Sequence, residues 1–525
     1  MDTFAKDRLP PREEWPRLHF DLPELRYPER LNCATVLLDD AVAEGHGDRP
    51  AILTDAGRIT YRELVARANR IANVLKDAGL EPGNRVLLRG YNGPELYAAW
   101  LAVMKAGAIA VTTMPLLRAP ELTAVIGKAK PAFALSDHRL LAELEAVAAP
   151  GGVGTVIAWG NGDLESRMAA ASDRFENADT AADDVCLLAF TSGTTGQPKA
   201  CVHFHRDVLA MADVVARHLL ETAPGDVYAG SPPIGFTFGL GALLVFPLRF
   251  RAATVPIEAP APATVLAAIE KHGITCLFTA PFAYRALAGE LAGRDLRTLK
   301  RCVSAGEFLP KAVSNLWFEK TGIRIIDGIG ATEMIHIFIA AAGDEVRPGS
   351  TGKPLPGYRA CVLDEAGKEL PRGSTGRLAV TGPTGCRYLD DARQRDYVRD
   401  GWNVTGDIYR LDEDGYFWFV SRADDMIVSA GYNIAGPEVE WALLAHPAVR
   451  ECAVIGAADS ERGTVVKACV VLAPGRAGDI SLVRELQDFV KQRIAPYKYP
   501  RVIEFLEALP KTATGKLQRK ALRNP

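Results

Sequence analysis

The chain has 525 residues, which is more than one hydrophobic core usually serves, so at least two domains are expected. Hydrophobic residues make up 48% and charged residues 24%, as in ordinary soluble globular proteins. The 61 basic residues nearly balance the 64 acidic ones, and the net charge of −3 gives no electrostatic case for binding nucleic acid or an anionic membrane.

The cysteines and the apolar runs indicate the compartment. Nine cysteines are scattered without a Cys-x-x-Cys pair, which favours free thiols in a reducing compartment over disulfides or zinc. The N-terminal residues lack the apolar stretch of a secretion signal, and no run of about eighteen apolar residues is long enough to span a membrane. We therefore expect a cytoplasmic protein.

Short apolar runs and helix-period segments alternate up to about residue 327. Residues 1–30, rich in Pro, Arg and Glu, are expected to form an extended arm held by a few aromatic side chains. The clearest elements that follow are helices over 61–76, 95–105 and 205–220 and strands over 85–89 and 108–113. Strand–helix–strand units at this spacing predict mostly parallel sheets covered by helices on both faces.

Three later changes in the sequence divide the chain. Residues 160–183 are polar and rich in Ala and Asp, which predicts a surface connection. From residue 349, Pro and Gly punctuate short strand-like runs, which predicts a small antiparallel β unit. The sequence thus predicts an α/β fold with a large N-terminal domain, residues 1–423, of mostly parallel sheets plus this β unit. A small α+β C-terminal domain, residues 424–525, follows.

The stretch over 185–199 is the strongest local candidate for a ligand site. An apolar run over 185–190 predicts a buried strand, which leads into a loop rich in Gly and hydroxyl side chains and closed by Lys199. Backbone N–H groups, hydroxyls and one ammonium suit a polyphosphate, although no Gly-Lys-[Ser/Thr] closes the loop as in a P-loop. Taken alone, this loop is equally compatible with a solvated turn.

Five further stretches place Gly beside charged or hydroxyl residues. They are 304–307 (SAGE), 327–333 (DGIGATE), 402–407 (WNVTGD), 421–434 (SRADDMIVSAGYNI) and 510–517 (PKTATGKL). Each stretch by itself is more often a turn than a site. Together with 185–199, in this order and spacing, they closely resemble the adenylate-forming superfamily over about residues 35–520.

Three other stretches carry a finer resemblance, to benzoate– and 2-aminobenzoate–CoA ligases. They are 27–32 (YPERLN), 236–241 (FTFGLG) and 332–338 (TEMIHIF). The resemblance implies that a carboxylate attacks the α-phosphate of ATP to give acyl-AMP and pyrophosphate, after which the CoA thiol displaces AMP. It implies ATP, Mg²⁺ and coenzyme A, a small aromatic carboxylic acid as substrate, and no nucleic-acid or membrane partner. It also allows a homodimer.

The resemblance assigns roles to residues of the adenylation step. Thr332 would contact the α-phosphate and Glu333 would bind Mg²⁺, while Lys516 would meet both the substrate carboxylate and the α-phosphate. Asp407 would accept the ribose hydroxyls, assisted by Arg422. The implied catalytic residues are Lys516, Glu333, Thr332 and Arg422. The implied ATP contacts are Thr191, Ser192, Gly193, Thr194, Thr195, Gly196, Lys199, Ala305, Gly306, Glu307, Asp327, Asp407 and Arg422.

The acyl pocket is expected where aromatic side chains could wall a flat slot, although core packing explains each Phe equally well. Thr237 stands where amino-acid-activating relatives keep an Asp, so a buried ammonium would lack its partner and α-amino acids are disfavoured. His336 would hydrogen-bond an ortho substituent of the ring, or else be a structural His bonded to backbone. The expected pocket residues are Phe236, Thr237, Phe238, Gly239, Ala305, Gly330, Ile335 and His336.

The resemblance further implies that the C-terminal domain turns about a hinge at Asp424, so that Lys516 leaves before the thiol enters. The expected CoA contacts are Gly431, Tyr432, Tyr497 and Lys498. Three residues depart from the common pattern of the family, and the third affects the CoA contacts. They are Ser421 in place of Gly, Ile329 in place of an aromatic, and Arg462 in place of a Trp.

Several alternatives stay open from the sequence. The adenylated acid could be loaded onto a carrier protein instead of CoA, or the substrate could be a medium-chain fatty acid. A non-catalytic nucleotide-binding regulator on the same fold is a third possibility, which Glu333, Asp407 and Lys516 argue against. His203 and His205 are interpreted as structural histidines and not as a metal pair, because the resemblance implies that relatives carry His here without a metal.

Overall fold

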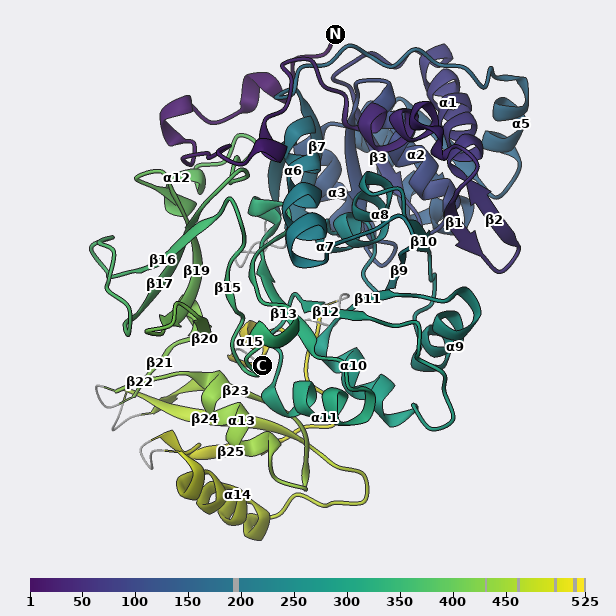
Figure 1. The fold of residues 1–525 in the computed structure, drawn as a ribbon. Helices are drawn as coiled ribbons and strands as arrows, with labels where there is room; N and C mark the ends of the chain where they lie inside the picture. The colour runs from purple at the N-terminus through teal and green to yellow at the C-terminus, as the bar shows by residue number, and fades with distance from the viewer. Residues whose placement is uncertain (192–197, 430–431, 460–462, 495–497, 513–516, 524–525) are drawn as a thin grey trace. The chain divides into compact units, whose positions relative to one another are not determined.

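The computed structural model of this chain describes residues 1–191, 198–429, 432–459, 463–494, 498–512 and 517–523. Its contacts group the chain into two compact units, residues 1–360 with 380–403 and residues 361–379 with 404–525. The functional boundary expected at residues 423/424 stays a prediction. Figure 1 shows the elements described below.

A nine-stranded sheet forms the larger part of the first unit. Its central strands are parallel and only its edges are antiparallel, as the strand–helix alternation predicts. In sheet order the strands are β15 (Lys353–Pro354), β14 (Ile337–Ala340), β13 (Ile325–Gly330), β12 (Arg301–Ala305), β11 (Cys276–Thr279), β9 (Val227–Gly230), β10 (Ala253–Val255), β1 (Pro50–Thr54) and β2 (Gly57–Thr60).

A six-stranded sheet is the second large sheet of the first unit. It is parallel except for the hairpin of its last two strands, and all five residues of its strand β3 are buried, as helices on both faces require. In sheet order the strands are β6 (Thr155–Trp159), β5 (Phe133–Asp137), β3 (Arg85–Arg89), β4 (Ile109–Thr113), β7 (Val185–Thr191) and β8 (Lys199–Phe204).

Helices cover these sheets, and several form where local signals predict them. Helix α1 begins with a capping box between Thr60 and Glu63 and buries the apolar face that includes Leu64 and Ile71. In Figure 1, α10 and α11 lie along the part of the nine-stranded sheet that contains β12 and β13. The longer helices of the unit are α1 (Tyr61–Asp77), α2 (Pro94–Lys105), α3 (Ala119–Ala129), α4 (Leu141–Gly151), α9 (Pro262–His272), α10 (Pro281–Gly289) and α11 (Lys311–Thr321).

The shorter helices of the first unit include one that the sequence analysis did not predict. Within the surface connection expected over 160–183 lies helix α5 (Asp163–Ala170), whose first turn is closed by hydrogen bonds from the Gly160 and Gly162 amides to the Glu165 carboxylate. The helix expected over 205–220 is present as α6 (His205–Met211) and the wider turn η7 (Ala212–Leu219). The others are α7 (Thr237–Leu240), α8 (Phe246–Arg249) and α12 (Gln394–Tyr397).

The second unit contains the predicted antiparallel strands and a smaller α+β arrangement. Its sheets are a five-stranded one, a two-stranded one and a three-stranded one in which β25 runs parallel to β24. The strands of these sheets are β16 (Arg359–Leu363), β17 (Thr375–Thr381), β18 (Val398–Arg399), β19 (Trp402–Leu411), β20 (Phe417–Arg422), β21 (Ile427–Ser429), β22 (Tyr432–Ile434), β23 (Val449–Asp459), β24 (Gly463–Leu472) and β25 (Val502–Phe505). Of these, β18 belongs wholly to the first unit, and β16, β17 and β19 contain residues of both units. The helices are α13 (Gly436–Leu444), α14 (Ile480–Arg493) and α15 (Arg519–Arg523).

The N-terminal arm and the thiols fit the sequence analysis. The arm is held through its aromatic residues, with the Trp15 ring 5.7 Å from Phe204 and the Tyr27 hydroxyl donating to Asp213. All nine cysteines are buried free thiols. In the part of the chain that the structure describes, every helix is too short or too polar for a membrane span.

Candidate active site

The hairpin of β7 and β8 positions the two ends of the predicted phosphate loop. Thr191 ends β7 and Lys199 begins β8, and the two residues face each other across the antiparallel pair. The loop residues between them that we predict to contact ATP are Ser192, Gly193, Thr194, Thr195 and Gly196, and these lie outside the described residues. The hairpin therefore brings Thr191 and Lys199 together at the mouth of the loop.

Lys199 belongs to a polar cluster at the entrance of this loop. Its ammonium group lies 2.6 Å from the Tyr388 hydroxyl and 3.4 Å from Oε1 of Glu333. The Tyr388 hydroxyl in turn donates a hydrogen bond to Oε1 of Glu333. Tyr388 is fully buried, and burial raises the pKa of its hydroxyl above the ordinary value. Tyr388 was not predicted, because a lone Tyr after Gly-Cys-Arg carries no chemical signal in the sequence.

The segment that carries Tyr388 runs beside β8. The Val202 amide donates to the Arg387 carbonyl at 2.8 Å, and the Leu389 amide donates to the Ala200 carbonyl at 2.9 Å. These bonds fix Tyr388 against the start of β8, where Lys199 lies. Positions 199 and 388 thus meet because backbone pairing brings two distant segments together.

Thr332 and Glu333 lie in a short turn, η9 (Thr332–Met334), that is held from behind by β8. His203 Nε2 lies 2.8 Å from the Thr332 carbonyl, which requires Nε2 to carry the proton that it donates. The other ring nitrogen of His203 lies 3.8 Å from the Asp207 carboxylate. His203 therefore has a structural role at the predicted site, in agreement with its interpretation from sequence.

The predicted adenine contacts lie where β12 and β13 end together. Ala305 is the last residue of β12 and pairs with Gly328 of the parallel strand β13. Gly306 follows with φ +88°, a conformation that favours glycine. Asp327 keeps some exposure in β13, yet partial burial raises the pKa of its carboxyl group above the ordinary value. Glu307 is half-buried beside them.

His336 is the centre of an aromatic cluster in the region of the predicted acyl pocket. Its ring lies 4.6 Å from Phe246 and 5.6 Å from Phe238, which also packs 5.5 Å from Phe278. His336 Nε2 lies 3.3 Å from the Phe238 carbonyl, whereas Nδ1 is buried without a hydrogen-bond partner in the described structure. Burial lowers the pKa of His336 to about 3, so the ring is neutral at ordinary pH.

Glycines and one strained residue shape this region. A Cβ on Gly239 would meet the Pro233 carbonyl oxygen at 2.3 Å, and one on Gly330 would meet backbone atoms of His336 at 2.8 Å. Ile335 has φ +63°, which is rare for a β-branched residue and is typical of functional turns.

Two predicted pocket residues line a small cavity. Phe236 and Thr237 line a space of about 10 Å³ together with residues of β4 and β7. This is roughly the room of one water molecule, so an aromatic ring would require the surrounding side chains to shift.

Residues of the second unit include the predicted ribose ligand. Asp407 is buried and forms an ion pair of 3.1 Å with Arg422. The Lys498 ammonium lies 2.6 Å from both carboxylate oxygens of Glu438. Of the remaining predicted residues of this unit, Gly431, Tyr497 and Lys516 lie outside the described residues, and for Asp424 and Tyr432 only the backbone is described.

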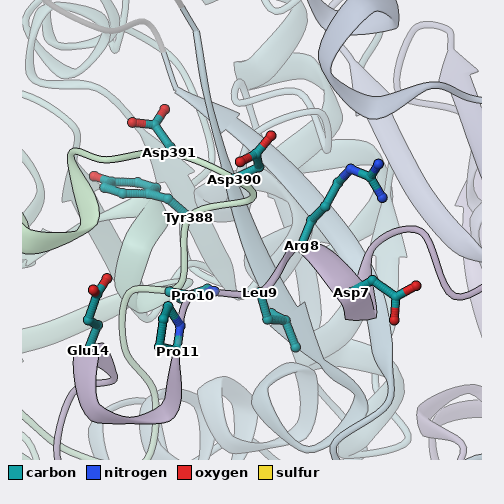
Figure 2. A pocket seen from close by; sticks show the side chains of 9 residues that line it. All are labelled: Asp7, Arg8, Leu9, Pro10, Pro11, Glu14, Tyr388, Asp390 and Asp391. Carbon is teal, nitrogen blue, oxygen red and sulfur yellow. The ribbon is translucent and has the colours of Figure 1, made fainter.

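A polar pocket of about 650 Å³ lies between the N-terminal arm and residues 388–391 (Figure 2). Its charged side chains are four carboxylates and one guanidinium, which disfavours a polyphosphate. In Figure 2 the Tyr388 ring borders the pocket while its hydroxyl points away from Arg8 and Asp7. The lining residues are Asp7, Arg8, Leu9, Pro10, Pro11, Glu14, Tyr388, Asp390 and Asp391.

His205 lies in a buried cluster with two thiols that sequence proximity did not suggest. The ligating atoms of Cys33, Cys186 and His205 lie within 4.8 Å of one another. His205 Nδ1 is 3.1 Å from the Cys33 sulfur and 3.2 Å from the Cys33 amide, which donates to it. Three donors in the described structure are fewer than the four of a closed zinc site, and Nδ1 already accepts a bond, so packing accounts for the cluster.

Comparisons with known proteins cover nearly the whole chain. Residues 39–387 match the model of the AMP-binding enzyme family, and residues 438–516 match that of the AMP-binding enzyme C-terminal domain. The chain is 37% identical to a benzoate–CoA ligase of Thauera aromatica over 96% of this chain and 97% of that protein.

Two solved structures are similar in sequence and fold. The anthranilate CoA ligase AuaEII, solved in complex with anthranoyl-AMP, has a TM-score of 0.90 at 33% identity and covers 95% of this chain and 98% of that one. A benzoate CoA ligase from Burkholderia xenovorans LB400 has a TM-score of 0.86 at 31% identity, over 94% of this chain and 100% of that one.

Proposed function

The chain belongs to the AMP-binding enzyme family, and from this premise we propose that it is an AMP-forming CoA ligase of small aromatic carboxylic acids. In the first half-reaction the acid attacks the α-phosphate of ATP, which gives acyl-AMP and pyrophosphate. In the second, the thiol of CoA displaces AMP and forms the thioester. The observation that carries the proposal is the full-length similarity to aryl-CoA ligases, which spans both family models.

The polar cluster at the phosphate loop supports the proposed handling of ATP. Lys199 and Thr191 bracket the loop that would hold the β- and γ-phosphates, and the ammonium group offsets their negative charge. Thr332, one residue before Glu333 in the same turn, would contact the α-phosphate. Ala305, Gly306 and Glu307 would border the adenine, and Asp407 with Arg422 would bind the ribose.

Glu333 suits a magnesium ion. Its carboxylate is buried, yet Tyr388 occupies only one of its oxygens in the described contacts, and Mg²⁺ prefers carboxylate and phosphate oxygens. When bound with ATP, the ion would supply charge neutralisation at the phosphates. The residue of this chain that would hold it is Glu333.

The C-terminal residues complete the proposed cycle. Lys516 would neutralise the substrate carboxylate and the α-phosphate during adenylation, and the turn about Asp424 would then remove it. Gly431, Tyr432, Tyr497 and Lys498 would face CoA, and Lys498 would have to exchange its ion pair with Glu438 for a CoA contact.

The aromatic cluster supports a planar, substituted ring as substrate. His336 Nε2 donates to the Phe238 carbonyl, so the partnerless Nδ1 is a hydrogen-bond acceptor. A buried acceptor of this kind favours an amino or hydroxyl substituent, as in 2-aminobenzoate, over an unsubstituted ring. The site would thus discriminate within the class of aromatic acids. Cytoplasmic location is part of the proposal, and the assembly, monomer or homodimer, would follow from size-exclusion chromatography.

A substrate panel tests the proposal. Purified protein with ATP and Mg²⁺ is given benzoate, aminobenzoates, hydroxybenzoates and octanoate, and pyrophosphate release and CoA-dependent AMP formation are measured. We expect aromatic acids to give both signals with free CoA. Pyrophosphate without CoA-dependent AMP would point to a carrier-protein acceptor, preference for octanoate would point to a medium-chain enzyme, and no pyrophosphate at all would contradict an enzymatic role.

A further inference from the structure

We propose that Tyr388 is a positioning residue that keeps the Glu333 carboxylate and the Lys199 ammonium group from closing into a tight ion pair, so that Glu333 can hold Mg²⁺ and Lys199 can meet the phosphates. This inference rests on the proposed function, because it concerns the first half-reaction. Its evidence, however, is a set of contacts within the first unit that none of the predicted motifs contains.

The hydroxyl of Tyr388 forms a bridge between two opposite charges. It accepts a hydrogen bond from Lys199 at 2.6 Å and donates its only proton to Oε1 of Glu333. A phenol has one donor and two lone pairs, so both bonds exist at once without competition. Lys199 and Glu333 therefore share a neutral group between them, and their direct ion pair is a long one, at 3.4 Å.

The bridge is rigid because the Tyr388 backbone and ring are held independently of Glu333. The Tyr388 amide donates to Oε1 of Gln394 at 2.9 Å, and its position is paired with Cys201 of β8. The Tyr397 ring packs edge-on at 5.9 Å, and the Lys199 ammonium also lies 4.5 Å from the centre of the Tyr388 ring. A fully buried ring with these contacts has little freedom to turn.

Removal of the hydroxyl would change what Lys199 and Glu333 do. Both side chains are largely shielded from water, with exposed fractions of 19% and 9%, so their attraction is poorly screened. Without the bridge, the ammonium group would close onto Oε1 and turn the long ion pair of 3.4 Å into a tight one. Glu333 would then be neutralised before Mg²⁺ arrives, and Lys199 would be drawn away from the phosphates. Mutation of a residue that hydrogen-bonds to a metal ligand typically lowers metal affinity or activity by about 10–100-fold.

The experiment compares Tyr388→Phe with Tyr61→Phe, which removes a hydroxyl from another fully buried tyrosine whose partner is the Ala252 carbonyl, 2.8 Å away. Binding of Mg·ATP is measured by calorimetry in the absence of the acid substrate. The rate of acyl-AMP formation and the rate of thioester formation from supplied acyl-AMP are measured separately. In Tyr388→Phe we expect Mg·ATP affinity and the first rate to fall about 10–100-fold and the second rate to be unchanged. Tyr61→Phe should keep all three.

Two outcomes would overturn the inference, and a double-mutant cycle keeps it testable if Tyr388→Phe is unstable. Unchanged Mg·ATP affinity in folded Tyr388→Phe, with wild type active, contradicts it. In a Glu333→Gln background, Tyr388→Phe should have almost no further effect on Mg·ATP affinity, and fully independent losses would also contradict it. If wild type binds Mg·ATP but forms no acyl-AMP from any acid, the proposed function is wrong. The binding measurements would still test whether Tyr388 positions Glu333 and Lys199.

Discussion

Arg387 and Asp207 form an ion pair in which both side chains are fully buried. Burial acts to raise the pKa of Asp207, but Arg387 and His203 outweigh it and hold that pKa below the ordinary value. Asp207 also faces His203, whose other nitrogen bonds the Thr332 carbonyl. The pair thus stands behind the turn that carries the proposed magnesium ligand.

Loss of one partner of this pair should destabilise the protein strongly. Arg387→Met leaves the Asp207 carboxylate buried without its counter-charge, and such changes cost about 3–5 kcal/mol. Urea unfolding at neutral pH should show this loss. Arg62→Ala, which breaks an exposed pair with Asp48 at 3.3 Å, should cost less than about 1 kcal/mol. Equal effects of the two substitutions would contradict the account.

His336 should set the preference between ring substituents. His336→Leu keeps a similar side-chain volume but removes the Nδ1 acceptor. The ratio of kcat/KM for 2-aminobenzoate to kcat/KM for benzoate should therefore fall about fivefold, which corresponds to the net contribution of one hydrogen bond. The 3- and 4-amino isomers serve as controls for general damage to the pocket. A ratio that does not change would remove His336 from substrate selection.

Particular residues show which features of the fold and the candidate site could be predicted from the sequence. Strand β3 was predicted at its true bounds because the centre of this buried parallel strand, residues 86–88, is a continuous apolar run between two arginines. Glu333 and Lys199 were predicted because their motifs resemble those of the adenylate-forming superfamily, and the structure brings the two side chains within 3.4 Å of each other. Tyr388 was missed because its partners lie 55 and 189 positions away, and helix α5 was missed because a polar surface helix lacks an apolar stripe.

Acid should weaken the fold partly through His336. The folded pKa of this ring is about 3, below the ordinary value of 6.5, so the unfolded chain binds a proton below pH 6.5 that the folded chain does not. This group therefore removes about 1.4 kcal/mol of stability per pH unit between pH 6 and pH 4. Urea unfolding at pH 7, 6 and 5 should show a shallower acid loss in His336→Leu than in wild type, and parallel curves would exclude the effect.

Asp407 should recognise the ribose hydroxyls of the nucleotide. Because a carboxylate accepts hydrogen bonds from the ribose hydroxyls, Asp407→Ala should lower kcat/KM for ATP about 10–100-fold, as expected for bonds to a charged group. The sharper test is discrimination: wild type should prefer ATP to 2′-deoxy-ATP and 3′-deoxy-ATP, and Asp407→Ala should lose most of that preference. Asp412→Ala, whose carboxylate bonds the Trp418 indole at 2.8 Å, should retain it. A preference that survives in Asp407→Ala would place the ribose elsewhere.

Substitution of Lys516 should slow the first half-reaction but not the second. Adenylation brings two anions together and needs a cation in the transition state, whereas attack of a thiol on acyl-AMP does not need this group. Lys516→Ala should therefore slow acyl-AMP formation by orders of magnitude and leave thioester formation from supplied acyl-AMP largely intact. Lys511→Ala removes the ammonium group of a lysine five positions earlier in the sequence, which is paired with Glu451 at 2.6 Å, and should affect neither rate strongly. Equal losses in both half-reactions for Lys516→Ala would mean that the lysine serves the fold or the nucleotide in general, and the assigned role would be wrong.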